Sequence, residues 1–283
     1  MSNLRNSYQG RLALIAGGSA GMGLALAQLL AEEGASVWLL ARHADTLETA
    51  CRSLSTSHGQ KHGAYAADVT RLDQVQAAVE HIRREAGVPE LLVNCAGGAH
   101  PGYVQELPLD IFRDMMELDY FGTLHMVKSW LPHMLERGSG HIVNVSSMAG
   151  FMGAFGYSAY GAAKYAVRGF SDVLRLELKP LGIRVSVVFP PDMDTPGLAN
   201  ENKTKPFETF AAGSTKALRP QDVARSTLKA IRRGKYIILP GFEPQLLYRL
   251  MLLVGNGIYP IMDSMIADAR KKKMKAGRTD GHI

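Results

Sequence analysis

A phenol and an ammonium group stand four residues apart in the segment Tyr160-Gly161-Ala162-Ala163-Lys164. Residues at this spacing share one face of a helix, so the two side chains can lie beside each other. A free phenol titrates at about pH 10, and a neighbouring cation favours the phenolate and lowers that pKa toward neutral pH. Two serines, Ser146 and Ser147, follow the predicted strand His141–Val145, and Ser147 precedes Tyr160 by 13 residues. The pattern predicts an acid–base centre in which Tyr160 transfers the proton.

A second motif is the glycine-rich segment Gly17-Gly18-Ser19-Ala20-Gly21-Met22-Gly23, which joins a predicted strand to a predicted helix. Glycine permits a tight turn and lets the backbone approach a pyrophosphate, while a helix N-terminus supplies N–H donors and a positive dipole. A strand before the turn and a helix after it are typical of a dinucleotide site. The residues that we expect to bind the dinucleotide here are Gly17, Ser19, Ala20, Gly21, Met22 and Gly23.

The same letters also match the Gly-x-Ser-x-Gly elbow of α/β-hydrolases, in which Ser19 would be the nucleophile. That elbow normally follows several strands, whereas this turn follows the first one. A hydrolase also needs a histidine late in the chain, and His282 lies in a charged tail. The sequence therefore favours the dinucleotide site over the hydrolase.

The end of the second predicted strand indicates which dinucleotide is bound. Sheets that bind NAD carry a carboxylate there, which accepts hydrogen bonds from the ribose hydroxyls. Here the chain reads Leu39-Leu40-Ala41-Arg42, with a guanidinium in place of a carboxylate. Arginine pairs bidentately with a phosphate, so Arg42 favours NADP(H). The alternative is that Arg42 is an ordinary solvated side chain.

Short apolar runs alternate with helical patterns through the first 240 residues, which predicts an α/β fold. The runs are almost continuously apolar, as in a parallel sheet covered by helices on both faces. We therefore expect a doubly wound parallel sheet in three layers, with ligands at the carboxyl ends of its strands. Residues 1–240 form the catalytic domain in this interpretation, and residues 241–283 are a helical extension of the same domain. The predicted strands are Arg11–Ala16, Ser36–Ala41, Gly63–Ala66, Leu91–Asn94, His141–Val145, Arg184–Phe189 and Tyr236–Leu239.

Composition excludes several other classes of protein. The 283 residues are 46% apolar and 20% charged, which suits a globular protein and not a disordered, collagen-like or coiled-coil chain. The net charge is +6, of which +4 lies in the last 16 residues, so the near-neutral body argues against nucleic-acid binding. Cys51 and Cys95 form neither a disulfide framework nor a metal motif, which indicates a reducing compartment. We expect no metal site.

Together the motifs resemble those of the short-chain dehydrogenase/reductase family, over Arg11 to Leu239. The resemblance implies that Tyr160 donates the proton in reduction, that Lys164 binds the nicotinamide ribose, and that Ser147 holds the substrate oxygen. It also implies NADPH as cofactor and a homo-oligomer, a dimer or a tetramer. The further residues that it assigns to the cofactor are Asp68 and Val69 beside the adenine, Asn94, Ala96 and Gly97 along the cofactor, Pro190, and Met193 and Thr195 at the carboxamide.

Two positions depart from the family pattern. In the motif Leu118-Asp119-Tyr120-Phe121-Gly122, an aspartate replaces the family's asparagine, which supports a water that leads protons to the lysine. A carboxylate can also hold a water, but it adds charge and lacks the amide's donors, so Asp119 is a catalytic candidate whose role in the relay is open. The second departure is Pro190-Pro191, which replaces the usual Pro-Gly and stiffens the turn.

This proline pair and the segment Gly153-Ala154-Phe155-Gly156-Tyr157 resemble one group within the family, the 3-ketodihydrosphingosine reductases. The resemblance implies that a long-chain keto lipid is the substrate, reduced with NADPH in sphingolipid metabolism. Two alternatives stay open. One is a reductase of another hydrophobic ketone or a hydroxysteroid-like substrate, and the other is a catalytically silent NADP-binding protein.

The extension poses a separate question. Leu246–Ile266 is rich in leucine, methionine and isoleucine but contains charged residues and Pro260, and we expect it to fall short of the roughly 20 apolar residues of a spanning helix. One interpretation is a helical pair packed on the core. The other is peripheral contact with a membrane, aided by the five cations between Arg270 and Lys275.

The polar N-terminus, Met1–Arg11, shows no secretory signal and lacks the membrane segment of animal relatives. We therefore expect a cytoplasmic protein, free or at the membrane surface.

Overall fold

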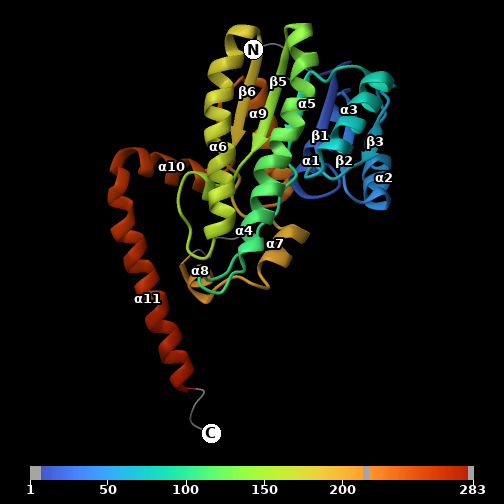
Figure 1. Ribbon diagram of the computed structural model, residues 1–283. Helices are drawn as coiled ribbons and strands as arrows, with labels where there is room; N and C mark the ends of the chain where they lie inside the picture. The colour runs from blue at the N-terminus through green and yellow to red at the C-terminus, as the bar shows by residue number, and fades with distance from the viewer. Residues whose placement is uncertain (1–7, 213–216, 280–283) are drawn as a thin grey trace.

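A seven-stranded parallel sheet forms the centre of the molecule in the computed structural model, which describes residues 8–212 and 217–279 (Figure 1). The strand order is β3-β2-β1-β4-β5-β6-β7, so the doubly wound sheet expected from the sequence is confirmed. All seven expected strands form: three have the predicted bounds, and the ends of the other four differ by no more than one residue. Their bounds are β1 Leu12–Ala16, β2 Ser36–Ala41, β3 Gly63–Ala66, β4 Leu91–Asn94, β5 Gly140–Val145, β6 Ile183–Val188 and β7 Ile237–Ile238.

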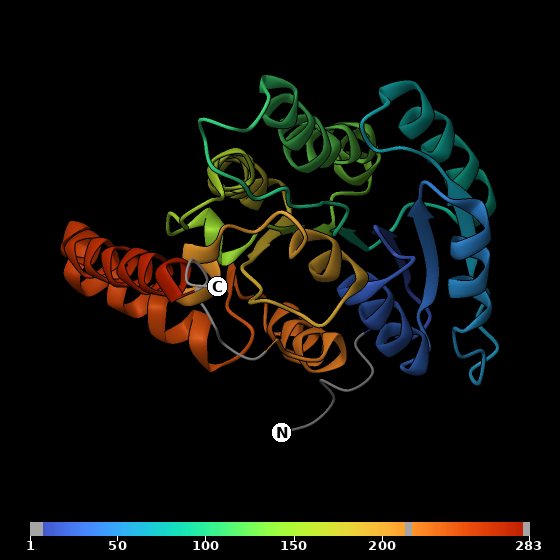
Figure 2. The same cartoon turned by 90° about the horizontal axis from the view of Figure 1, so that it is seen from below.

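Helices cover both faces of the sheet, and Figure 2 shows the three layers. The helices with buried residues on one face are α1 Gly21–Glu32, α2 Ala44–Arg52 and α9 Pro220–Arg232. Those on the other face are α3 Leu72–Ala86, α5 Gly122–Arg137 and α6 Ser158–Leu178. Because each face of the sheet is covered, strands such as β1 and β4 are buried along their whole length, which explains their unbroken apolar sequence.

The order in which the chain adds strands reverses between β1 and β4, which pair in parallel. The connections from β1 and β4 therefore run to opposite faces of the sheet, and the crevice between them, beyond the carboxyl ends of the strands, is where ligands of such sheets bind. Short elements surround this edge. They are α4 Leu109–Met115, η1 Met116–Phe121, η2 Met148–Gly150, α7 Pro196–Glu201 and α8 Phe207–Ala212, whereas η3 Lys179–Leu181 lies at the opposite edge, directly before β6.

The extension is a pair of helices, α10 Phe242–Val254 and α11 Ile258–Thr279, joined by the turn η4 Gly255–Gly257. In Figure 1, α10 leaves the body beside α6, and α11 turns to run past α8. Leu247, Tyr248 and Met251 of α10 pack against a cluster around Phe151 and Phe189. One face of α10 is therefore part of the core.

The stretch Phe242–Met274 is long and apolar enough to cross a membrane by length and composition, with a mean hydropathy of 1.4 over its most apolar 18 residues. The expectation that this segment falls short of a spanning helix is therefore wrong on those two criteria. In the structure, however, the glycines of η4 divide the stretch into two helices that differ in direction (Figure 1). Six per cent of the most apolar window is buried, so most of this apolar surface faces outward.

Candidate active site

Tyr160 and Lys164 lie on adjacent turns of α6, near its N-terminus, as their spacing predicts. The lysine Nζ is 5.5 Å from the centroid of the Tyr160 ring. Lys164 is buried, and its Nζ donates a hydrogen bond of 3.2 Å to the carbonyl oxygen of Val145, at the end of β5. The strand end thus fixes the ammonium group beside the phenol.

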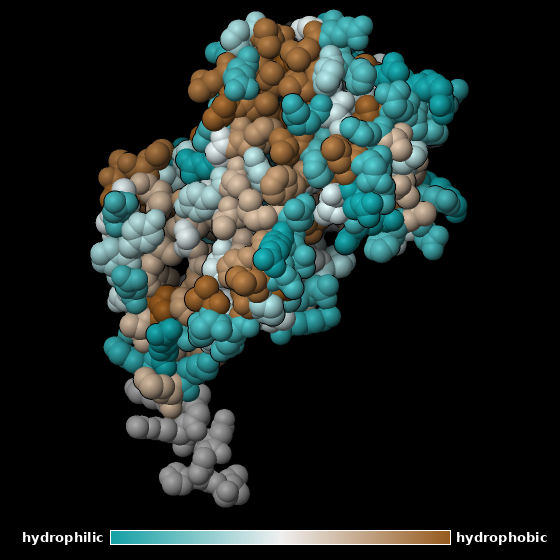
Figure 3. Space-filling view, viewed as in Figure 1, coloured by the Kyte–Doolittle hydropathy of each residue, from teal (hydrophilic) through white to brown (hydrophobic). Residues whose placement is uncertain are grey.

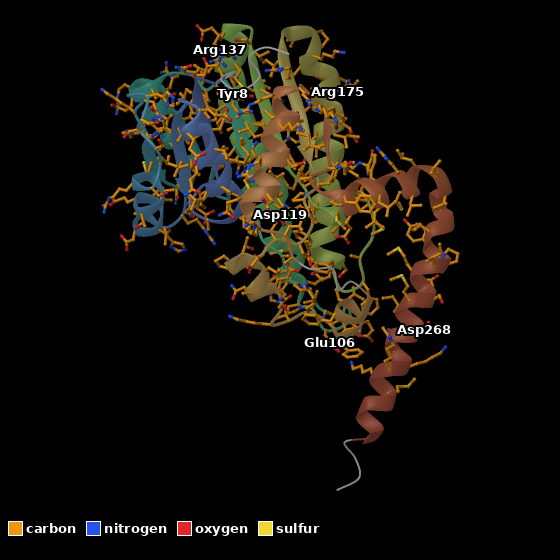
Figure 4. All side chains as sticks on the ribbon, turned by 180° about the vertical axis from the view of Figure 1, so that it is seen from behind. Tyr8, Glu106, Asp119, Arg137, Arg175 and Asp268 are labelled. Atoms are coloured by element: carbon orange, nitrogen blue, oxygen red, sulfur yellow. The ribbon has the colours of Figure 1, made fainter. Side chains whose placement is uncertain are left out.

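Asp119 lies in η1, a π-helical turn between α4 and α5, and Figure 4 shows it inside the molecule at the edge of the sheet. π-Helical turns occur often at functional sites because they redirect one side chain out of the regular helical positions. The Oδ1 atom of Asp119 is 3.2 Å from Lys164 Nζ and accepts a hydrogen bond of 3.1 Å from the amide of Gly98. Its Oδ2 atom is buried without a hydrogen-bond partner among the described residues. The carboxylate therefore pairs directly with the lysine.

Burial and charge set the protonation of these three groups. Burial raises the pKa of Tyr160 to about 12, against the effect of Lys164, and the Asp119 carboxylate adds to the rise. The expectation that Lys164 brings this pKa toward neutral pH is therefore wrong: the cation acts in that direction, but burial outweighs it. Burial also raises the pKa of Asp119, while Lys164 opposes this. The Asp119 carboxylate raises the pKa of Lys164 against burial, so the lysine stays charged.

The two serines after β5 have different surroundings. The buried Ser146 hydroxyl donates a hydrogen bond of 2.9 Å to the carbonyl oxygen of Lys164. Ser147 caps η2, where its hydroxyl accepts a hydrogen bond of 3.2 Å from the amide of Ala149, and it also bonds to the phenol of Tyr160. Ser147 is thus the serine in contact with the phenol.

The glycine-rich turn forms a cradle whose backbone packs too closely for side chains. Gly17 has φ +80°, and a Cβ there would lie 2.5 Å from the amide nitrogen of Ala96. Gly21 has φ +56° at the first turn of α1, and a Cβ on Gly23 would lie 2.1 Å from the carbonyl oxygen of Gly17. Backbone amides can therefore face a ligand at the N-terminus of α1, which is the geometry that binds a pyrophosphate. These residues fit a dinucleotide.

One cavity of about 970 Å³ connects the cradle to the acid–base centre. Most of the residues singled out from the sequence line it. They are Gly17, Ser19, Ala20, Gly21, Met22, Arg42, Val69, Ala96, Gly97, Ser147, Tyr160, Lys164, Pro190, Met193 and Thr195. Arg42 is exposed at the end of this cavity beyond β2, where a 2′-phosphate could reach its guanidinium.

Four of the singled-out residues lie outside the cavity lining. Gly23 packs against the turn, and Asp119 lies behind Lys164. Asp68 accepts hydrogen bonds from the amide and the hydroxyl of Thr70. Asn94 is buried between strands, where its amide donates to Asn144 Oδ1 at 2.9 Å. These four residues support the site from behind.

The extension contributes a part of the lining that sequence reasoning missed. Side chains of α10 and α11 line the same cavity as Tyr160. Those on α11 follow the spacing of one helix face, a pattern that could have indicated a buried or ligand-facing stripe. They are Ile258, Ile261, Met262, Met265 and Ile266, joined from α10 by Glu243, Leu247 and Leu250.

Comparison with known proteins places the chain in a family. A family model for short chain dehydrogenase matches residues 11–206. A "3-ketodihydrosphingosine reductase" of Dictyostelium discoideum is 41% identical over 248 residues, which cover 81% of this chain and 74% of that protein. The protein of the same name from Mus musculus is 37% identical over 228 residues, which cover 79% of this chain and 69% of that protein.

A solved structure is similar over most of the chain as well. It is the L-sorbose reductase of Gluconobacter frateurii, described as complexed with NADPH and L-sorbose, with 27% identity and a TM-score of 0.73. The similarity covers 84% of this chain and 98% of that one. The sheet order, the Tyr160–Lys164 pair beside Ser147 and the glycine cradle agree with these matches. The chain belongs to the short-chain dehydrogenase family.

Proposed function

We propose that this chain reduces the 3-keto group of 3-ketodihydrosphingosine to the alcohol dihydrosphingosine, with NADPH, as a step of sphingolipid biosynthesis. The observation that carries the proposal is the single cavity, which joins a dinucleotide cradle, a phenol–lysine pair and an apolar wall. A long-chain ketone needs all three. The two relatives of 41% and 37% identity that bear the name of this activity support the choice of substrate.

The chain's own residues would hold the cofactor at two places. The amides of the turn from Gly17 to Gly21 would bind the pyrophosphate at the N-terminus of α1, and Arg42 would pair with the 2′-phosphate. Lys164 would contact the nicotinamide ribose, and Met193 and Thr195 the carboxamide. When bound, NADPH supplies the hydride for the carbonyl carbon.

Tyr160 then supplies the proton. With a pKa of about 12 the phenol is protonated at neutral pH, so it can donate to the ketone oxygen as that oxygen gains negative charge. The Ser147 hydroxyl orients the oxygen, because it lies against the same phenol. Lys164 stabilises the phenolate that remains after proton transfer, since its ammonium group is 5.5 Å from the ring centroid. Asp119 holds the lysine in this position.

The test is the loss of NADPH absorbance with purified protein and 3-ketodihydrosphingosine, compared with a small diketone. We expect reduction of the lipid ketone, and none by the variant Tyr160→Phe. Activity on the diketone alone would overturn the lipid assignment and favour a reductase of another ketone. Activity on neither ketone would mean a catalytically silent nucleotide-binding protein.

We also propose that the extension contacts a membrane, where such a substrate resides. The outer faces of its helices expose large apolar side chains, with Phe242 79%, Leu252 71% and Leu253 81% exposed. Figure 3 shows a hydrophobic area at the corner where α10 meets α11. Exposed apolar surface of this kind is typical of interfacial helices.

The cations contribute less to this contact than their number implies. Arg270 lies 3.4 Å from Glu208, Lys271 lies 3.4 Å from Asp268, and Lys273 bonds to the hydroxyl of Tyr103. The side chain of Lys275 lies outside the described part of the chain. We therefore expect binding to vesicles that depends on apolar residues more than on salt.

Co-sedimentation with neutral and anionic vesicles, at low and high salt, tests this contact. Leu252→Ser with Leu253→Ser should release the protein, whereas Leu176→Ser, which replaces a 67% exposed leucine on α6, should not. A protein that stays in the supernatant with every vesicle would overturn the membrane proposal. The homo-oligomer implied by the family resemblance stays a prediction, and the sedimentation velocity of the protein without vesicles tests it.

A further inference from the structure

The helices of the extension face the catalytic cavity with an unbroken apolar stripe. On α11 the stripe runs from Ile258 to Ile266 at intervals of three and four residues, and on α10 it includes Leu247 and Leu250. Ile258 is 7% exposed, whereas Ile261 is 56% and Met265 is 47% exposed, so the stripe lines an open groove. The outward residues of α11, such as Ser264, do not line the cavity. The helix thus has a cavity face and an outer face.

The opposite wall is apolar too. It belongs to the segment between β5 and α6, where Met148, Met152, Ala154 and Phe155 line the same cavity. Methionine side chains adapt to ligands of variable shape because they are unbranched and flexible. We call the space between this segment and the stripe on α10 and α11 the slot. It is continuous with the space in front of Tyr160.

Two kinds of charged side chain lie near the slot: Glu243 at the start of α10, and a cluster around Lys205 whose members are engaged with one another. Lys205 Nζ lies 3.0 Å from Glu201 Oε1 and 3.9 Å from Asp192 Oδ2, and the Tyr157 hydroxyl bonds to Glu201. This cluster lines the cavity at the C-terminal end of α7 and just beyond it. The stripe from Leu247 to Ile266 and the wall opposite it therefore offer mainly apolar contact.

Contacts beyond the stripe hold α11 across the slot. The Arg270 guanidinium lies 3.4 Å from Glu208 on α8 and 5.7 Å from the ring of Phe155, which is part of the opposite wall. Lys273 bonds to the Tyr103 hydroxyl at 3.1 Å, and Tyr103 itself donates to Glu208 at 2.6 Å. The helix is thereby fixed to both α8 and the wall that it faces.

We propose that the slot binds the alkyl chain of the substrate, with α10 and α11 as the wall that determines which chain lengths are accepted. This inference rests on the proposed reduction of a long-chain ketone. From Ile258 to Ile266 the helix advances about 12 Å, at about 1.5 Å per residue. An extended chain advances about 1.3 Å per carbon, given a C–C bond of about 1.5 Å, so this stripe covers about nine carbons. The extension is then a substrate-binding element as well as a surface helix.

The test is the dependence of kcat/KM on chain length, measured below the critical micelle concentration of each substrate. Two series are needed, 2-amino-3-ketones and plain 3-ketones, each lengthened two carbons at a time. Burial of a methylene is worth about 0.8 kcal/mol, which is about fourfold in kcat/KM per carbon. We expect a steep rise with length that levels off once the slot is filled.

Met262→Trp fills the slot midway along the stripe, so the rise should stop at shorter chains. The ratio of kcat/KM for long over short ketones should fall roughly tenfold or more, since about 6 Å of the stripe lies beyond Met262. Ser264→Trp places the same ring on the outer face of α11 and should leave the ratio unchanged. Thermal melting of both variants checks that each protein is folded.

The outcomes separate the two proposals. A flat length profile in a series that is reduced would overturn the slot and leave the reaction standing. A steep profile for plain ketones, with no reduction of the amines, would support the slot and refute 3-ketodihydrosphingosine as the substrate. No reduction in either series would overturn both. An equal effect of Met262→Trp and Ser264→Trp on the ratio would also overturn the slot.

Discussion

The replacement Asp119→Asn would measure what the carboxylate does to the acid–base centre. At 3.2 Å, two unit charges attract by about 5 kcal/mol at an effective dielectric constant of about 20, before the cost of burying them. The positive charge of Lys164 is thus largely offset by Asp119 before it acts on Tyr160, whose ring centroid is 5.5 Å from Nζ. The amide removes a negative charge that raises the pKa of Tyr160 and also the pKa of Lys164, so the shift at Tyr160 is the net of both changes. We expect this pKa, about 12 with the carboxylate present, to fall by about one unit.

The assay is the pH dependence of kcat at saturating NADPH, in both directions of the reaction. Reduction requires the protonated phenol, so its rate falls as pH rises through the pKa of Tyr160. In the variant this fall should begin about one pH unit lower, which corresponds to about 1.4 kcal/mol. Oxidation of the alcohol requires the phenolate, so its rise with pH should move to lower pH by the same amount. At neutral pH the reduction rate should be kept or increased, because asparagine is the residue usual in the family.

Asp114→Asn is the matched control, because Asp114 is an exposed carboxylate on the nearby α4 and should leave both profiles unchanged. Thermal melting shows whether each variant is folded. If the alkaline limb of folded Asp119→Asn stays in place, the carboxylate does not act on Tyr160 and the reasoning is refuted. Loss of activity at every pH would show that the enzyme uses the carboxylate itself.

Three further predictions concern the cofactor site, the catalytic pair and the core. Tyr160→Phe should abolish reduction and leave NADPH binding nearly intact, whereas Lys164→Ala should weaken both reduction and NADPH binding. Fluorescence titration with NADPH measures the binding of each variant. Weak NADPH binding by Tyr160→Phe would contradict the assignment of proton transfer to Tyr160 and of cofactor binding to Lys164. Arg42→Ala should raise KM for NADPH by roughly one to two decades, since a charged hydrogen bond is worth about 1.5–3 kcal/mol, and should change KM for NADH much less; Arg52→Ala is the exposed control. His141 is buried and neutral, with a pKa that burial lowers to about 3, against about 6.5 when unfolded. Unfolding therefore takes up a proton between those values, so the free energy of unfolding should fall by about 1.4 kcal/mol per pH unit below about 6.5, and His141→Asn should flatten this slope in urea titrations.

Local signals predicted most of the fold. Each strand is a short apolar run. β4 Leu91–Asn94 is entirely buried, and its apolar sequence predicts a strand covered on both faces of the sheet. The starts of β5 and β6 differ from the prediction, because Gly140 and Ile183 pair in the sheet one residue before the predicted starts. The sequence contains no separate signal for that pairing. Pairing between distant strands decides such ends.

The acid–base centre shows where local reasoning stops. The spacing of Tyr160 and Lys164 predicts their shared helix face, and the structure has it. The net direction of the Tyr160 pKa shift was predicted wrongly, because burial by segments distant in the chain outweighs the effect of Lys164. Likewise, the place of Asp119 in the π-helical turn decides that it pairs with the lysine itself. Sequence spacing predicts which two side chains lie beside each other. The burial that sets their pKa values depends on the whole fold.

The two functions expected for the extension, burial against the core and contact with a membrane, do not exclude each other. Its apolar residues suggested either burial against the core or contact with a membrane, as if one face had to serve one purpose. A helix presents different residues on its two sides, and on α10 Leu247 packs against the core and lines the cavity while Leu253 is 81% exposed. Inner residues can therefore contact a lipid chain in the slot while outer residues contact the bilayer that supplies it. Because a reductase of a bilayer lipid must move its substrate from one apolar medium to another, a helix pair that borders both shortens the path through water.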